Sequence, residues 1–326
     1  MSATIIVKDA LRQSVETASE GRQTVLRTSK GYPSYFNVIP SFKCEEISDS
    51  MGTGLHPAFV VNGIEKSEIL VGTYQAIISG GQALSLPYQA PKTNINFDLA
   101  RAACAASGPG FHLLTNYEWA AVALWMVKNG YGELRGNTNS GKSHSNPEEC
   151  GVPSGDSGKT LTGSGPDAWR HDRTPYGISD LVGNIWEWVD GLKLVGGQIV
   201  MPLGNDFDMD ESAWSKTGAA VNGKDGIQIS DKITNHGWFN TPFDKITMEG
   251  SQPLPASTNQ ALLCPCDGSF GIPGRVWADT SKGFEALPFR GGGWFIGSFG
   301  GLAALGLLYE RSVADSRLGF RPAFIE

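Results

Sequence analysis

The segment from Phe289 to Phe324 constrains the fold more than any other part of this 326-residue chain. It opens with Arg-Gly-Gly-Gly-Trp and closes with Gly-Phe-Arg-Pro. The glycines Gly291 and Gly292 allow a backbone to pass close to a neighbouring strand, and the proline restricts the backbone further. Between these two ends the side chains share neither a period nor a chemistry. The sequence therefore predicts a defined backbone that carries exchangeable side chains.

The composition narrows the class of protein. Forty-two glycines favour a loop-rich globular fold over one built from long helices. The formal net charge of −7 argues against nucleic acid as a partner, because such binding depends on clustered Lys and Arg. Residues 1–21 do not resemble a signal peptide, and no apolar run approaches a membrane-spanning length, so membrane insertion is not expected. The five cysteines are scattered and odd in number, which indicates folding in a reducing cytoplasm without a disulfide framework.

Two helices are predicted from their end signals. Thr115 and Glu118 stand three residues apart before an apolar run and form a capping box, in which each side chain satisfies a free N–H at the helix start. Gly130 is expected to end this helix in a left-handed conformation. A second helix is predicted to begin near Asn96 and to stop at Gly108.

The chain divides into an arm and a domain on this interpretation. Residues 1–50 contain short alternating segments and are expected to form a small β-rich or extended arm that serves oligomerisation or docking. Residues 51–326 are expected to form one domain, with a tight turn at Asn62-Gly63 between two strands. The stretch at about 195–280 has mixed charge and many turn signals, and is interpreted as an insertion that decorates the domain.

Four motifs carry a resemblance to a known family. They are "HLLTNYEWAAVALW", "YGISDLVGNIWEWV", "FRGGGW" and "LGFRPAF", in that order along the chain. From about residue 57 to residue 326 the chain resembles proteins with the C-type lectin fold of the formylglycine-generating-enzyme type, also called the sulfatase-modifying-factor type. The resemblance implies an α+β, loop-rich fold. Because one fold hosts many functions, the activity has to be judged from the residues.

The enzymatic branches of this superfamily require ligands that this chain lacks. The resemblance implies that a formylglycine-generating oxidase would bind copper through a cysteine pair in its C-terminal segment, because soft copper(I) prefers sulfur. Residues 289–326 contain no cysteine. The iron-dependent sulfoxide synthases need clustered histidines, and the five histidines here are widely separated. We therefore expect no enzymatic activity, with an oxidative enzyme that lacks recognisable metal ligands as the alternative.

A further branch fits the C-terminal segment, namely the variable proteins of diversity-generating retroelements. The segment resembles theirs in the Arg311-Ser312 pair and in the terminal Gly-Phe-Arg-Pro-Ala. The resemblance implies a ligand-binding protein in which residues at about 290–318 are rewritten by adenine-directed mutagenesis while the fold stays constant.

This resemblance has a consequence for composition. Randomising the two adenines of an asparagine codon cannot yield Lys, Glu, Gln, Met or Trp. Between Gly293 and Leu318 these five types occur only at Trp294 and Glu310, which match framework positions of the family. The remaining residues of the segment all belong to the permitted set.

The outward, variable face is expected to bind the ligand. Its predicted members are Phe295, Ile296, Phe299, Leu308, Tyr309, Val313, Asp315 and Arg317. The aromatic members are the strongest candidates because aromatic side chains dominate binding hot spots. Ile296, Leu308 and Val313 have a place in the core as their alternative, and Leu302, Leu305 and Leu307 are assigned to the core outright. Three more positions are either variable slots that hold glycine or steric necessities: Gly293, Gly300 and Gly306.

The frame that holds this face needs large buried groups. Its expected anchors in the core are Trp186, Trp188 and Trp294. Arg290 and Arg321 are expected to pair with carboxylates such as Glu187, because a buried guanidinium is costly alone.

A calcium site is a separate hypothesis. Asp180 and Glu187 bracket the backbone carbonyls of Gly183 and Ile185, and mixed oxygen ligands suit a hard cation. The resemblance implies calcium at these positions, with asparagine in the related enzymes where this chain has Asp180. The alternative is that Glu187 pairs with an arginine and Asp180 caps a turn. No cofactor is expected to be required beyond this possible structural calcium.

Together these interpretations predict a retroelement-diversified receptor-binding protein of a phage tail. Its expected target is a host cell-surface protein or glycan, reached from the virion after cytoplasmic assembly. The alternatives are a binding protein displayed on the bacterial surface, or a cytoplasmic one. The resemblance also implies a homo-oligomer, with a trimer as the expected state. The triplets Glu-Pro-Asn and Gln-Pro-Asp of calcium-dependent lectins are absent, so sugar binding through calcium is not expected, whereas direct contact with sugar stays open.

Overall fold

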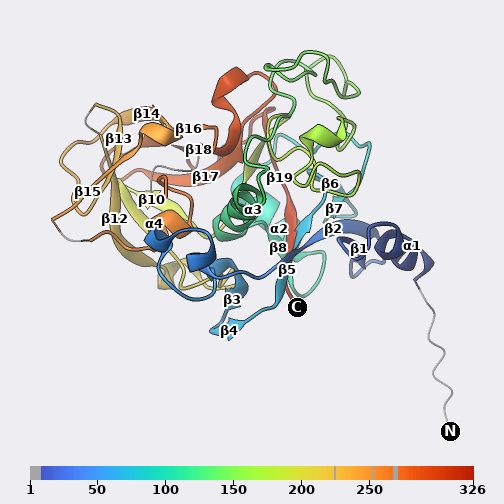
Figure 1. Ribbon diagram of the computed structural model, residues 1–326, viewed down its shortest axis with the longest axis horizontal. Coiled ribbons are helices and arrows are strands. Elements are labelled where there is room, and N and C mark those ends of the chain that lie inside the picture. Colours follow the sequence, from blue (N-terminus) through green and yellow to red (C-terminus); the bar gives the residue numbers. More distant parts are fainter. Residues whose placement is uncertain (1–8, 224, 252, 267–270) are drawn as a thin grey trace, which may run out of the picture.

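The structure, a computed structural model, describes residues 9–223, 225–251, 253–266 and 271–326. Short helices and two large sheets are joined by long loops, which confirms the expected α+β, loop-rich class (Figure 1). The α-helices of these ranges are α1 (Ala10–Ala18), α2 (Phe97–Ala105), α3 (Asn116–Lys128) and α4 (Ser257–Gln260). Single 3-10 turns lie at Cys44–Glu46, Asp49–Met51, Pro57–Phe59, Asp167–Trp169, Glu211–Ala213 (η5), Phe243–Lys245 and Gly297–Phe299 (η7). Among these helices, none has the length and apolar character needed to cross a membrane.

Both predicted helices begin where their end signals place them. In α3 the Glu118 N–H donates to the Thr115 hydroxyl at 3.1 Å, and the Thr115 N–H donates to the Glu118 carboxylate at 2.8 Å. Gly130 follows the helix with a φ of 79°. The side chain of Asn96 accepts the Leu99 N–H at the start of α2. Most of α3 is buried, so this helix forms the centre of the larger hydrophobic core.

The first sheet contains the N-terminal strands. Its order is β1 (Gln23–Arg27), β2 (Pro33–Pro40), β5 (Glu68–Gly72), β20 (Pro322–Phe324) and β8 (Phe111–Leu113). β2 pairs antiparallel with β5 and buries Phe36 and Ile39. The strands β1 and β2 of the expected N-terminal arm are therefore part of the same sheet as strands of the domain. Their apolar side chains Phe36 and Ile39 are buried there. The role of the arm in oligomerisation or docking stays a prediction.

The second sheet contains both the C-terminal segment and the stretch at about 195–280. Its order is β14 (Trp238–Pro242), β16 (Arg275–Asp279), β18 (Gly301–Tyr309), β17 (Glu285–Gly291), β10 (Lys193–Val195), β11 (Gln198–Met201), β12 (Ser215–Gly223), β13 (Ile227–Ser230) and β15 (Thr247–Glu249). β9 (Trp186–Trp188) pairs with β17, and β19 (Leu318–Phe320) pairs with β9. The interpretation as a decorating insertion needs correction, because this stretch supplies strands of the sheet itself (Figure 1). β14 and β16 lie next to β18, and β11, β12, β13 and β15 extend the sheet beyond β17 and β10.

Two small hairpins complete the strands. One joins β3 (Val60–Val61) to β4 (Ile64–Glu65), and the other joins β6 (Ala76–Ser79) to β7 (Gln82–Ser85). At the first turn Asn62 and Gly63 have φ values of 51° and 72°. Positive φ at both turn residues matches the twist of a two-residue hairpin, so the predicted Asn-Gly turn is confirmed.

A buried ion pair joins the two sheets. Side chains alternate along a strand, so Glu187 of β9 points away from Trp186 and Trp188. Its carboxylate accepts two hydrogen bonds from the Arg321 guanidinium, at 2.9 Å from Nε and 2.8 Å from Nη2. Arg321 also donates to the carbonyl of Gly72 in β5 at 2.8 Å. Both partners are almost fully buried, and the expected pairing of Arg321 with Glu187 is present.

We expect Glu187→Gln to lower the free energy of unfolding by roughly 3–5 kcal/mol, because it leaves a buried guanidinium without its counter-charge. Urea unfolding of the purified chain measures this change. The matched control is Glu46→Gln, whose exposed pair with Lys128 is expected to contribute about 1 kcal/mol or less. Equal effects at the two positions would show that the Arg321 pair does not hold the sheets together.

Candidate functional site

The C-terminal segment is held by strand pairing on both sides. β17 and β18 run antiparallel with Phe289 opposite Gly306, and residues 292–300 connect them. Gly291 and Gly292 have φ values of 90° and 95°, and a Cβ at Gly291 would lie 2.6 Å from the carbonyl oxygen of Leu181. A side chain at either position would strain the backbone, which is why the glycine pair is needed.

All eight residues of the predicted variable face reach the surface at least in part. Phe295 and Phe299 are 40% and 46% exposed, and the others are half-buried: Ile296, Leu308, Tyr309, Val313, Asp315 and Arg317. The residues assigned to the core, Leu302, Leu305 and Leu307, are buried. Ile296, Leu308 and Val313 also pack against the smaller hydrophobic core, so each has one side in the core and one side open.

Six of the eight line a single pocket of about 200 Å³. They are Phe295, Ile296, Leu308, Tyr309, Asp315 and Arg317. Phe299 lies outside this lining on η7, where its ring meets the ring of Trp277 edge-on at a centroid distance of 6.5 Å. The guanidinium of Arg275 lies 4.5 Å from the centre of the Phe299 ring. Val313 is not part of the pocket.

The rest of the pocket lining includes four aromatic residues that were not predicted to bind ligand. They are Trp186, Trp238, Trp277 and Phe289. Trp238 and Trp277 lie on β14 and β16, within the stretch that was interpreted as decoration. The alternation in Arg275–Asp279, where Val276 and Ala278 are buried, is the signal that places Trp277 on the other face.

The three tryptophans expected as core anchors have different roles. Trp188 is fully buried, and its indole N–H donates to the carbonyl of Ile95 at 3.1 Å. Trp186 is 7% exposed and lines the pocket. Trp294 is half-buried, with its ring over Gly158, so it anchors the loop to the surface of the domain and not to the core.

The polar residues of the pocket bind each other. Arg317 donates to both carboxylate oxygens of Asp315, at 2.8 Å from Nε and 2.7 Å from Nη2. This pairing lowers the pKa of the Asp315 carboxyl and raises the pKa of Arg317. The guanidinium also lies 5.2 Å from the centre of the Phe295 ring. The pocket lining therefore carries an ion pair and no net charge.

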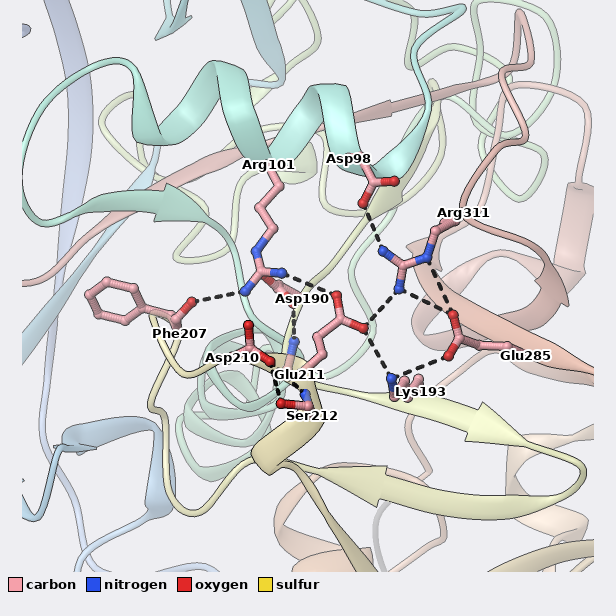
Figure 2. Close-up of polar contacts among 11 residues, drawn as sticks. Asp98, Arg101, Asp190, Lys193, Phe207, Asp210, Glu211, Ser212, Glu285 and Arg311 are labelled. Carbon is pink, nitrogen blue, oxygen red and sulfur yellow. Dashed lines mark hydrogen bonds and ion pairs between the residues drawn. The ribbon is translucent and has the colours of Figure 1, made fainter.

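A network of charges fixes the loop that carries Asp315 and Arg317 (Figure 2). Arg311 contacts Asp98 of α2 at 2.9 Å, Glu211 of η5 at 2.8 Å and Glu285 of β17 at 3.1 Å. Lys193 bridges Glu211 and Glu285 from the other side, at 3.1 and 3.2 Å. Partial burial acts to lower the pKa of Arg311, but the hydrogen bond and negative charge of Glu211 outweigh it, so the pKa is raised. Arg311 thus belongs to the frame although it lies within the variable segment.

Gly306 is a steric necessity. A Cβ there would collide with the ring of Phe289, which stacks on Tyr309 at a centroid distance of 4.8 Å and an angle of 21°. At Gly293 and Gly300 the nearest atoms belong to flexible side chains of the variable face itself, so both alternatives stay open there.

Arg290 departs from its expected pairing with a carboxylate. Its guanidinium donates to the Asn116 side chain at 2.9 Å and to the carbonyls of Ala261 and Leu262 at 3.0 and 3.1 Å. Within the described residues its Nη1 has no partner. Burial lowers the pKa of Arg290 to about 9. The Glu187 carboxylate does not serve Arg290 because Arg321 and Gln75 already bind it.

The oxygens of the hypothetical calcium site surround an amide. Nε2 of Gln75 donates to the carbonyls of Asp180 and Ile185, both at 3.2 Å, and to the Glu187 carboxylate at 3.0 Å. The Asp180 carboxylate accepts the Gly163 N–H at 2.7 Å, and burial raises its pKa. The alternative stated for Glu187, an arginine partner, is present.

The backbone at Gly183 is also engaged within the protein. Gly183, the remaining proposed ligand, has a φ of 79° and approaches the backbone of Asn137 closely. Among the described ranges, no group of three or more His, Cys, Asp or Glu residues is arranged to hold a metal ion. Calcium binding, one of the two alternatives, is untested, and the position of the Gln75 amide favours the other one.

Comparisons with known proteins give weak likenesses in structure. No family model matches the chain, and no curated protein matches it. Variable protein 1 of Treponema denticola is similar over 93% of this chain and 98% of its own, with 13% identity and a TM-score of 0.36. PvdO from Pseudomonas aeruginosa is similar over 92% and 97%, with 14% identity and a TM-score of 0.39. The P3c variant of Major Tropism Determinant is similar over 89% and 62%, with 12% identity and a TM-score of 0.33.

The structural neighbours thus include one protein named as a variable protein and one named as a tropism determinant. These likenesses concern the fold alone.

We expect calcium to leave the melting temperature of the wild-type chain unchanged, because the Gln75 amide lies among the oxygens that a cation would need. Scanning fluorimetry in calcium and in chelator measures this. Gln75→Leu is expected to melt lower, because each buried oxygen that loses its donor costs about 1–3 kcal/mol. A calcium-dependent rise in the wild type that disappears in Asp180→Ala would instead establish the metal site.

Proposed function

We propose that this chain is a ligand-binding protein whose C-terminal segment, at about residues 290–318, is diversified by a retroelement. The aromatic pocket and the adjacent Phe299 are its recognition surface. The eight residues of the variable face change between variants, while the frame and the aromatic residues outside the segment stay the same. On this proposal the protein acts by binding and catalyses no reaction.

One observation carries the proposal. In a segment that is buried for much of its length, the eight residues predicted to vary are at least partly accessible, and six of them line one pocket. Between them lie side chains that cannot change without disturbing the core, such as Leu302 and Leu305. A surface built in this way can exchange its contacts at a lower cost in stability than the buried residues between them, because substitutions that open cavities in the core cost more than those at accessible positions.

The chemistry of the pocket supports binding. Aromatic side chains supply a large contact area and lose little conformational freedom, as in antibody loops. Arg317 and Asp315 of the lining bind each other through two hydrogen bonds, and the guanidinium lies over the ring of Phe295. Neither charged group of the described lining is therefore unpaired.

The setting of this function is also proposed. We infer that the chain works on the tail of a phage particle as a homotrimer and binds a protein or glycan of the host surface. The motif resemblance supports this setting. Several copies on one particle would multiply a modest affinity through avidity.

A pair of libraries tests the proposal. The first library randomises the eight residues of the variable face, and most of its members are expected to fold. The second library randomises eight framework positions of the same segment: Gly291, Leu302, Leu305, Leu307, Gly306, Leu318, Phe320 and Arg321. Nearly all of its members are expected to unfold, since they create cavities, overpacked sites or unpaired charges. Resistance to protease at a fixed dose measures the folded fraction.

The same face library, selected on whole bacterial cells, is expected to yield variants that bind different hosts. In the source genome, a near-identical copy of the coding region for residues 289–324 should lie beside a reverse transcriptase gene and differ at adenines. A face library as intolerant as the framework library would contradict the proposal.

The proposed trimer has its own measurement. Light scattering is expected to give three times the chain mass of 34.8 kDa. A monomer that persists at high protein concentration would contradict it.

A further inference from the structure

The pocket has two walls of different origin. The variable segment supplies one wall. The other consists of aromatic rings outside residues 290–318, from β9, β14, β16 and β17. Trp186 meets Trp277 edge to face at a centroid distance of 5.6 Å and Phe289 at 5.0 Å. Diversification of the segment would leave this aromatic wall in place, so it acts on every variant.

The position of Trp238 extends this wall toward solvent. In the pairing of β14 with β16, Asn240 lies opposite Trp277. Trp238 is two residues from Asn240 and therefore projects from the same face, diagonally beside Trp277. Its side chain is 56% exposed. A large exposed aromatic group beside a pocket marks a contact surface.

The wall also contains hydrogen-bond donors that the described residues do not satisfy. Framework tryptophans donate their indole N–H, as Trp119 does to the carbonyl of Leu302 at 2.8 Å. Within the described ranges, the indole N–H groups of Trp186 and Trp277 have no acceptor. The indole nitrogen of Trp214 is fully buried without a partner, but those of Trp186 and Trp277 are not fully buried. On the variable wall, the Tyr309 hydroxyl also lacks a hydrogen-bond partner among the described residues. All three donors belong to residues that line the pocket.

Charge restricts the ligand further. Asp315 and Arg317, the charged residues of the lining, neutralise each other through two hydrogen bonds. A charged ligand would find no free counter-charge in the pocket. The favoured ligand is neutral, has an apolar face for the rings, and has acceptor oxygens at its edge.

We propose that the pocket binds one pyranose ring of a neutral glycan. This inference rests on the proposed function and names the class of ligand for the same site. The C–H groups of a pyranose face carry partial positive charge and fit over the negative face of an aromatic ring. Its hydroxyl oxygens accept from the indole and phenol donors. An aliphatic side chain of a protein would leave these donors unpaired, which reduces affinity because desolvated donors without acceptors are costly.

The size of the pocket agrees with a single ring. Its volume of about 200 Å³ is smaller than the roughly 300–1,000 Å³ of pockets for larger small molecules. The aromatic wall selects the glycan class, and the variable residues select which sugar and linkage is bound. Phe299, exposed beside Trp277, is placed to contact the next sugar of the chain.

Saturation-transfer NMR on the full-length chain tests the inference. The probes are the methyl glycosides of neutral hexoses and of N-acetylhexosamines, because this method detects weak, single-site binding. We expect saturation of the ring C–H protons of at least one probe. Trp238→Ala and Trp277→Ala are expected to reduce this signal at least tenfold. Trp277→Phe, which keeps an aromatic face and loses the donor, is expected to give an intermediate signal.

The control variant is Tyr88→Ala, because Tyr88 is an aromatic residue of similar exposure, at 60%, that is not part of the pocket. It is expected to bind as the wild type does. Melting curves confirm that each variant is folded, and Trp238 provides the decisive variant if Trp277→Ala unfolds.

Two probes represent the competing class of ligand, protein side chains: p-cresol for tyrosine and 3-methylindole for tryptophan. Binding of these probes that depends on Trp277 or Trp238, without binding of any glycoside, would overturn the glycan inference and leave the proposed function intact. Glycoside binding that survives both tryptophan variants would also overturn it, as would no binding of either class. Failure of the two libraries, by contrast, would contradict the proposed function itself.

Discussion

The buried pair of Glu187 and Arg321 is the contact on which the arrangement of this protein depends. Neither charge reaches water, so each is tolerated only while the other is in place. Arg321 lies between β19, which pairs with β9 in the second sheet, and β20, which pairs with β5 and β8 in the first. The ion pair therefore sets where the C-terminal strand passes from one sheet to the other. The two loops that carry pocket residues, 292–300 and 310–317, connect β17 to β18 and β18 to β19, all strands of the second sheet.

Stability and recognition are assigned to different side chains of one short segment. Leu302, Leu305 and Leu307 of β18 are buried, whereas Tyr309, which follows a shift in the register between β17 and β18, lines the pocket. Arg311 is part of the frame because three carboxylates from separate elements hold it. On the proposed function, the remaining residues recognise the ligand, although Ile296, Leu308 and Val313 also pack against the smaller core. On the proposed glycan inference, the aromatic residues outside the segment supply ring faces that every variant shares.

Local signals in the sequence were reliable where neighbours along the chain decide the outcome. The capping box at Thr115 and Glu118 and the turn at Asn62-Gly63 depend on residues within a few positions, and both are present. The accessibility of the eight face residues also followed from the segment itself. The strands that residues 195–280 add to the second sheet were not predicted, and Arg290 binds an amide and carbonyls instead of a carboxylate among the described residues. Strand pairing and buried contacts between distant segments leave no mark in a local pattern.

By itself the sequence determined the start of α3, the Asn62-Gly63 turn and the glycine conformations at Gly291 and Gly292, since local steric and hydrogen-bonding demands are revealed by residue types. Which positions of the C-terminal segment tolerate exchange is its prediction. Only the tertiary structure decided that Trp238 and Trp277 complete the pocket and that the Gln75 amide lies among the oxygens of the supposed metal site. The reason is physical. β16 pairs parallel with β18, and the Gln75 amide contacts the carbonyls of Asp180 and Ile185 from a distant loop. Such contacts depend on which surfaces are buried together once the whole chain has folded.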